Sequence, residues 1–342
     1  MTSRAFITGV SGLVLTDEER EFMRWERPWG FILFKRNIDS PAQVLNLVEQ
    51  LRESIEAPDG PVLIDQEGGR VQRLGPPNWP IYPPGAIFGT LYDIDRQQGL
   101  TAARLSARLI AADLIDLGIT VDCLPLADVP VEGADAVIGN RAYGTDPDKV
   151  AAIGRAVTDG LEQGGVLPVL KHIPGHGRAT ADTHFKLPVV DTLKTELEAV
   201  DFAAFKPLAD LPMAMTAHVV FSAIDPAQPA TTSATMIAQV IRSTIGFQGL
   251  LMSDDVSMNA LAGSIAERTR ASIAAGCDLV LHCNGKLEEM REVAREAPEL
   301  AGKALDRARR ALASRKPPQP FDRAAARAEL DVLIGRAGVL SS

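Results

Sequence analysis

Short apolar runs alternate with longer helical segments from near the start of the chain to about residue 281. This order is expected when parallel β-strands are joined by crossover helices. Because each strand is followed by a helical segment, the pattern predicts an α/β fold. The eight candidate strands are Ala5–Val10, Gly30–Phe34, Pro61–Ile64, Thr120–Leu124, Leu167–Leu170, Met213–Ala217, Gly249–Met252 and Asp278–Leu281.

Eight strands favour a closed (β/α)8 barrel of the TIM type over an open sheet. Such a barrel takes about 250 residues, more with insertions, and the chain has 342. We expect residues 1–300 to form the barrel and the Ala/Arg-rich residues 301–342 to add C-terminal helices packed on it. The predicted helices between strands include Pro41–Ile55, Gln97–Leu117, Asp148–Gln163, Ser233–Thr244 and Ser264–Ala275.

Charge and composition exclude several classes of partner. Lys and Arg number 35 against 44 Asp and Glu, a net charge of −9, which argues against nucleic acid or an anionic membrane. No stretch approaches the ~20 apolar residues of a membrane span. The start of the chain lacks a secretory signal, and Cys123, Cys277 and Cys283 are odd in number and unpatterned. We therefore expect a cytoplasmic protein without disulfides, and a self-contained barrel is consistent with a monomer.

Polar residues follow four of the predicted strands directly. In (β/α)8 barrels the catalytic groups lie at the C-terminal ends of the strands, so four such coincidences indicate a site there. The four polar segments are Asp65-Gln-Glu-Gly-Gly-Arg-Val-Gln-Arg73, Lys171-His-Ile-Pro-Gly-His-Gly177, Thr216-Ala-His218 and Ser253-Asp-Asp255.

The apolar run Gly249–Met252 leads to two consecutive carboxylates, Asp254 and Asp255. A carboxylate held on a rigid strand end suits nucleophilic attack, which needs closely fixed geometry. An aspartate at this place also commonly caps the next helix. We expect one aspartate to be functional and the other structural, and alternation alone does not say which.

Three of the five histidines fall between His172 and His184. A zinc site is the first alternative, but Pro174, Gly175 and Gly177 break any helix that would space the ligands, and no cysteine is near. No metal or other cofactor is therefore expected. Asp182 and His184 are two residues apart, so in an extended loop the carboxylate could orient the imidazole for acid–base work near neutral pH.

Five further residues are candidates for holding a sugar, whose hydroxyl groups both donate and accept hydrogen bonds. Taken singly, each of them is better explained by a surface salt bridge. The five are Asp65, Arg73, Arg141, Lys171 and His172.

Three of these segments together resemble glycoside hydrolase family 3, and within it the bacterial β-N-acetylhexosaminidases of peptidoglycan recycling. The motifs are Ile64–Arg73, Lys171–Gly177 with the following Asp182-Thr-His184, and Ser253–Met258. The resemblance extends to about Asn284. Ile173 departs from it, because an aromatic residue is expected before Pro-Gly-His-Gly. Many relatives carry a second domain with an acid/base carboxylate, for which this chain is too short.

The resemblance implies a retaining exo-β-N-acetylglucosaminidase. Asp254 would be the nucleophile, and His184, oriented by Asp182, the general acid/base. The five sugar-holding candidates would grip a terminal N-acetylglucosamine, and the substrate would be a disaccharide with anhydro-N-acetylmuramic acid derived from muropeptides.

Three alternatives remain open. A family 3 β-glycosidase or a glycoside phosphorylase of other specificity would keep the same residues, because an imidazole base does not repel phosphate. A sugar-binding barrel without activity would have lost the nucleophile or the histidine, and both are present. A metal hydrolase would depend on the histidine cluster.

Overall fold

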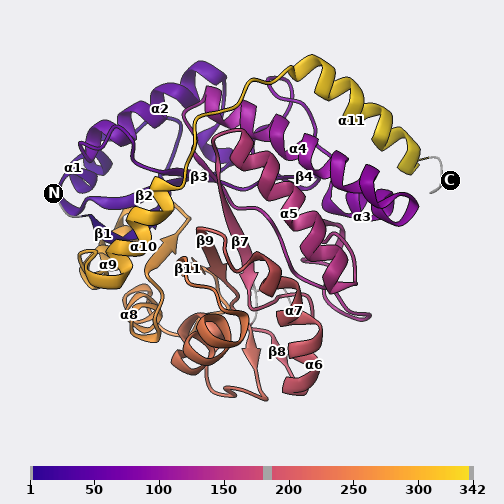
Figure 1. Cartoon of the computed structure of the whole chain (residues 1–342). Helices are drawn as coiled ribbons and strands as arrows, with labels where there is room; N and C mark the ends of the chain where they lie inside the picture. The colour runs from indigo at the N-terminus through magenta and orange to yellow at the C-terminus, as the bar shows by residue number, and fades with distance from the viewer. Residues whose placement is uncertain (1–2, 180–186, 339–342) are drawn as a thin grey trace.

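The computed structural model describes residues 3–179 and 187–338. Its centre is a closed barrel of eight parallel strands in which chain order is also the order around the barrel (Figure 1). The barrel strands are β1 (Arg4–Thr8), β2 (Pro28–Leu33), β3 (Val62–Ile64), β6 (Val121–Asp122), β7 (Leu167–Ile173), β9 (Met213–Thr216), β11 (Leu250–Asp255) and β12 (Leu279–His282).

All eight predicted strands are present, and they close into the predicted barrel. The α-helices are α1 (Asp17–Glu26), α2 (Pro41–Ser54), α3 (Gly85–Ile94), α4 (Arg96–Asp116), α5 (Pro147–Gln163), α6 (Lys194–Ala199), α7 (Asp201–Phe205), α8 (Ile265–Ala275), α9 (Leu287–Glu296), α10 (Gly302–Ala313) and α11 (Arg323–Gly338). The remaining elements are short strands β4 (Gln66–Gly68), β5 (Val71–Gln72), β8 (Val189–Val190) and β10 (Val220–Phe221), 3₁₀-helices η1 (Lys35–Asn37), η2 (Gly139–Arg141), η3 (Lys206–Leu208) and η4 (Ala230–Thr232), and π-helix η5 (Met236–Ile245).

Side chains alternate between the barrel interior and the surrounding helices. On β11, Leu250 and Met252 belong to the cluster that fills the interior, while Leu251 belongs to the cluster facing the helices. The same period of two holds on β7, where Val169 points inward and Leu170 outward. Both faces are buried, which explains why the strands read as continuous apolar runs.

The helices begin where capping residues place them. Thr16 accepts a hydrogen bond from the Glu19 amide, and the Glu19 side chain accepts one from the Thr16 amide, so α1 starts with a capping box. The segment predicted as the helix Ser233–Thr244 forms the π-helix η5. The predicted helices at α2, α4, α5 and α8 agree with the structure within about two residues.

The two C-terminal helices pack in different places. Ala308 and Ala311 of α10 join the cluster inside the barrel, so α10 covers one end of the strands. Helix α11 lies along α3 and α4 on the outer surface, far from α10 in Figure 1. An extended segment carrying Pro317, Pro318 and Pro320 separates them.

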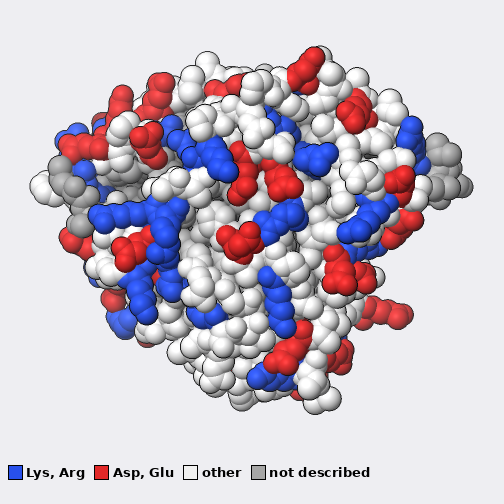
Figure 2. Space-filling model, in the orientation of Figure 1, with Lys and Arg blue, Asp and Glu red and all other residues white. Residues whose placement is uncertain are grey.

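The surface carries charges of both signs. Acidic and basic side chains are interspersed over the face seen in Figure 2. Cys123, Cys277 and Cys283 are buried and form no disulfide. Within the described residues, no helix is both long and apolar enough to cross a membrane.

Candidate active site

A cavity of about 260 Å³ opens at the C-terminal ends of the barrel strands. This is slightly below the ~300–1,000 Å³ typical of sites for drug-sized ligands, so the cavity suits a single sugar unit better than a chain. All six predicted site residues that the structure describes line it: Asp65, Arg73, Arg141, Lys171, His172 and Asp254. Asp182 and His184 lie outside the described residues.

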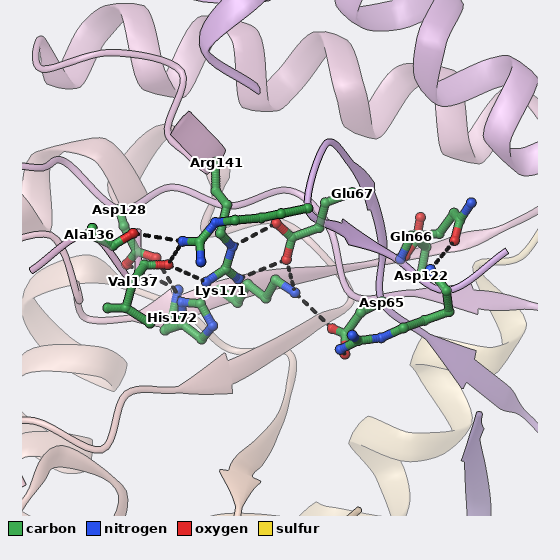
Figure 3. A network of polar contacts seen from close by, with 12 residues as sticks. Asp65, Gln66, Glu67, Asp122, Asp128, Ala136, Val137, Arg141, Lys171 and His172 are labelled. Atoms are coloured by element: carbon green, nitrogen blue, oxygen red, sulfur yellow. Dashed lines mark hydrogen bonds and ion pairs between the residues drawn. The ribbon is translucent and has the colours of Figure 1, made fainter. Parts of the chain in front are cut away.

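Four of these residues join in one chain of ion pairs through a fifth residue, Glu67 (Figure 3). Arg73 donates to Asp65 at 2.9 Å, and Lys171 Nζ lies 2.9 Å from Asp65 and 2.6 Å from Glu67. Arg141 then binds Glu67 with two hydrogen bonds of 2.8 and 2.9 Å. Such bidentate pairs fix the guanidinium plane, so the donors of Arg141 are held in place.

The network shifts the pKa of each member toward the value that favours its charged form. Burial raises the pKa of Glu67, but Arg141 and Lys171 outweigh burial and hold it at about 2. Lys171 and Arg73 likewise overcome burial and lower the pKa of Asp65 well below its usual range. The pKa of Lys171 is raised, because Asp65 and Glu67 more than offset its burial. All three groups are therefore charged near neutral pH.

A small hairpin positions Asp65 and Glu67. Strands β4 and β5 pair antiparallel, and the Gln66 side chain inside the hairpin accepts hydrogen bonds from the Arg73 and Leu74 amides. The turn passes through Gly68 at φ +93°, a conformation that favours glycine. A Cβ at Gly68 would lie 2.3 Å from the Pro83 carbonyl oxygen. Glycine at this position therefore lets the hairpin pack closely against the backbone of Pro83.

A second buried group, Asp128, holds the two histidines of the Lys-His-Ile-Pro-Gly-His segment. Its carboxylate lies 2.7 Å from His172 Nδ1 and accepts a 2.7 Å hydrogen bond from the His176 amide. His172 and His176 together outweigh burial and lower the pKa of the Asp128 carboxyl group. With Nδ1 engaged, His172 has only Nε2 left for a ligand. Burial and the neighbouring His172 lower the pKa of His176 to about 4.

Asp254 and Asp255 have different surroundings. The Asp255 carboxylate accepts hydrogen bonds from the amide and hydroxyl of Ser257 and from the Cys283 amide, so it holds the turn after β11. Asp254 Oδ1 accepts one hydrogen bond, from the Asp255 amide at 2.8 Å, and no hydrogen bond joins Oδ2 to another described residue. Asp255 is therefore the structural aspartate of the pair, and Asp254 presents an uncommitted oxygen.

The environment of Asp254 keeps it ionised. Burial raises its pKa, but His218, His172 and the hydrogen bond from Asp255 outweigh that effect and lower it. Leu250 and Met252 point into the barrel, and Asp254 lies two residues further along the same strand at the cavity. A charged carboxylate with a free oxygen meets the basic requirement for a nucleophile.

Arg178 anchors the chain just before the segment that carries Asp182 and His184. Its guanidinium donates to Asp201 at 2.7 Å and to Glu196 at 2.9 Å, on α7 and α6. Ile173, the departure from the family pattern, is fully buried in the layer between strands and helices. Across residues 3–179 and 187–338, no group of three or more His, Cys, Asp or Glu side chains is arranged to hold a metal ion.

Comparison with known proteins decides the family. The model of the glycosyl hydrolase family 3 N-terminal domain matches residues 10–314. The chain belongs to glycosyl hydrolase family 3. This confirms the resemblance seen in the three motifs.

Relatives within the family cover most of the chain. A β-hexosaminidase of Alkalilimnicola ehrlichii is 37% identical over 85% of this chain and 83% of its own length. The crystal structure of NagZ from Neisseria gonorrhoeae in complex with N-trifluoroacetyl-D-glucosamine matches with a TM-score of 0.85 and 30% identity, over 100% of this chain and 99% of that one. A family 3 β-N-acetylglucosaminidase from Paenibacillus matches with a TM-score of 0.83 and 27% identity, over 97% of this chain and 66% of that one.

Two residues that contact the predicted site were missed in the sequence. Glu67 is two residues after Asp65, so in an extended segment both side chains lie on the same side. Asp128 closely follows the predicted strand Thr120–Leu124, the signal that identified the other polar strand ends.

Proposed function

We propose that this family 3 enzyme is a retaining exo-β-N-acetylglucosaminidase with Asp254 as its nucleophile. The observation that carries the proposal is the free, ionised oxygen of Asp254 in a cavity of monosaccharide size. Across that cavity, Asp65, Lys171 and Arg141 present hydrogen-bond donors and acceptors suited to sugar hydroxyls.

The proposed reaction has two steps. Asp254 attacks the anomeric carbon while a protonated His184 gives its proton to the glycosidic oxygen, which breaks that bond and leaves a glycosyl ester on Asp254. Neutral His184 then takes a proton from water, and the resulting attack releases the sugar with its β configuration retained. Asp182 orients and charge-stabilises His184 through both steps.

The relatives support the choice of sugar. The β-hexosaminidases and the N-trifluoroacetyl-D-glucosamine complex of NagZ point to a terminal N-acetylglucosamine as the group that the cavity holds. Asp65, Arg73, Arg141, Lys171 and His172 would grip it. We further propose that the substrate is a muropeptide-derived disaccharide and that the protein acts in the cytoplasm as a monomer during peptidoglycan recycling.

The first test compares hydrolysis of p-nitrophenyl N-acetyl-β-D-glucosaminide with that of the corresponding β-glucoside. We expect strong preference for the N-acetyl sugar and loss of turnover in Asp254→Asn. The exposed Asp331→Asn on α11 serves as a matched control that should leave turnover unchanged. Preference for the glucoside would contradict the proposed substrate, and an active Asp254→Asn would contradict the proposed nucleophile.

The role of His184 needs a substrate with a poor leaving group, because an activated phenol leaves without a proton. We expect His184→Ala to lose far more than tenfold of the turnover of such a substrate, and a loss within about tenfold would contradict its assignment. Running the parent enzyme with and without phosphate distinguishes hydrolysis from phosphorolysis, since the latter yields the sugar 1-phosphate.

A further inference from the structure

A ring of hydrogen bonds encloses the backbone of the proposed nucleophile. The Asp254 amide donates to Thr216 Oγ1 at 3.3 Å, and Thr216 Oγ1 lies 2.8 Å from Thr231 Oγ1. Thr231 Oγ1 lies 2.7 Å from Nδ1 of His218, and His218 Nε2 lies 3.0 Å from the Asp255 carbonyl oxygen. The ring thus starts at the amide of one aspartate and ends at the carbonyl group of the next.

A proton on Nε2 of His218 gives the hydrogen bonds of the ring one consistent set of donors. Thr216 accepts from the backbone and donates to Thr231, and Thr231 donates to Nδ1 of His218. His218 then carries its proton on Nε2 and donates it to the backbone carbonyl oxygen. Thr231 Oγ1 also lies 3.1 Å from the Ala217 carbonyl oxygen.

These residues come from neighbouring parts of the barrel. Thr216 ends β9 and His218 follows it, while Thr231 belongs to η4, and β9 pairs with β11 next to the aspartates. Thr216, His218 and Thr231 are each fully buried. None of them lines the cavity, and their hydrogen bonds to the proposed nucleophile and its neighbour are made with the backbone.

We propose that His218 and Thr231 are positioning residues that clamp the Asp254–Asp255 backbone and thereby aim the Asp254 carboxylate. This inference rests on the proposed function of Asp254. The clamp fixes the peptide whose amide binds Asp254 Oδ1, which leaves Oδ2 oriented toward the anomeric carbon. A shift of about 1 Å in such a group can cost a hundredfold in rate, so a clamp on both sides of the nucleophile has a measurable effect.

The test replaces single hydroxyl groups without changing side-chain shape. Thr231→Val removes the hydroxyl group from the ring, Thr231→Ser keeps it, and Thr216→Val breaks the ring at a second point. Thr158→Val is the matched control, because Thr158 is equally buried on α5 and its hydroxyl group has no hydrogen-bond partner. Each variant is first compared with the parent by thermal melting.

Two readouts are measured on the folded variants. One is kcat and KM on p-nitrophenyl N-acetyl-β-D-glucosaminide. The other is the rate at which a slow fluorinated N-acetylglucosaminide labels Asp254, followed by intact and peptide mass. We expect either valine variant to lower kcat and labelling rate about 10- to 100-fold with KM within about threefold. Thr231→Ser and Thr158→Val should stay near the parent.

The outcomes separate the clamp from the proposed function. If the parent is labelled on Asp254 but both valine variants are labelled at the parental rate, the clamp is refuted and the nucleophile stands. If Thr231→Ser is as slow as Thr231→Val, retaining the hydroxyl group does not preserve the rate, so packing at this position and not the hydrogen bond sets it, which also refutes the clamp. If the parent is labelled elsewhere or not at all, the proposed function fails and the clamp fails with it. Should Thr231→Val not fold, Thr216→Val decides.

Discussion

Replacing Glu67 by glutamine removes one negative charge from the centre of the buried ion network. Glu67 is 8% exposed and binds both Arg141 and Lys171. Glutamine has nearly the same shape and still accepts one hydrogen bond, but it leaves the three cations Arg73, Lys171 and Arg141 with Asp65 as the one carboxylate of the network. The variant should therefore be less stable, and it should hold Arg141 less firmly.

The pKa of Glu67 gives the size of the expected loss in stability. That pKa falls from 4.5 in the unfolded chain to about 2 in the folded protein. A depressed pKa stabilises the protein above the unfolded value, here by about 3 kcal/mol at pH 7, and this contribution is lost as the pH falls from about 5 toward 2. The loss expected on breaking a buried ion pair is similar, about 3–5 kcal/mol. For a chain of this length, 3 kcal/mol corresponds to a melting temperature lower by about 4 °C.

The assay is thermal and urea unfolding of the parent, Glu67→Gln and the control Glu288→Gln at several pH values. Glu288 pairs with Arg291 on the surface and its side chain is 83% exposed, so its variant should change stability by less than about 1 kcal/mol. The gap between parent and Glu67→Gln should narrow by about 1 kcal/mol when the pH is lowered from 7 to about 3.5. A melting temperature equal to that of the parent at pH 7, or a gap that does not depend on pH, would refute this account of the network.

Three further predictions concern the same cavity. Asp128→Asn should raise KM about tenfold, because His172 loses a charged partner, and a KM equal to that of the parent would contradict this. Gly85→Ala should lower kcat/KM as well as the melting temperature, because the new Cβ would lie 2.2 Å from the Arg141 carbonyl oxygen. Unchanged kinetics would contradict this and show that the backbone at Arg141 can move freely. The pKa of Asp254 is lowered from 3.8. On an activated substrate, kcat/KM should therefore begin to decline only below about pH 4, and a decline that begins above pH 5 would point to another group.

The barrel could be predicted because every strand is apolar on both faces and is followed by a helical segment. Asp65, Lys171 and Asp254 could be predicted as site residues because they follow such strands directly. Arg141 could be named as a possible sugar-binding donor but could not be placed in the site by a strand end, since it belongs to the short helix η2 inside a long connection. Its position near Asp65 depends on the pair with Glu67, which joins segments 74 residues apart.

The choice between Asp254 and Asp255 could not be made from the alternation pattern of the strand, and only the family resemblance favoured Asp254. On a strand buried on both sides, alternation of apolar and polar residues is lost, so neither face can be assigned to the interior. The structure distinguishes the two through contacts from β12 and the turn after β11, which engage Asp255. The amide of Cys283 is 28 residues from Asp255 in sequence, so its hydrogen bond leaves no local signal.

The positions of the three charged groups at the strand ends follow from the layered packing of side chains inside such a barrel. Side chains inside a (β/α)8 barrel form layers, and alternate strands contribute to each layer. Asp65, Lys171 and Asp254 come from the third, fifth and seventh strands around the barrel. Each lies two residues beyond an inward-facing apolar side chain, namely Leu63, Val169 and Met252.

The floor of the cavity is therefore the next layer of side chains inside the barrel, in which polar residues replace apolar ones. The first strand, which completes the set of alternate strands, contributes Gly9 two residues beyond the inward-facing Ile7. A Cβ at Gly9 would lie 2.5 Å from the Cys283 carbonyl oxygen and 2.8 Å from the Arg36 guanidinium group, so this position has no room for a side chain. The layer therefore has three charged members and a fourth position where Cys283 and Arg36 take the space of a side chain, and the cavity lies above the three charged groups. The same packing rule that closes the apolar core thus accounts for a cavity that begins directly above it.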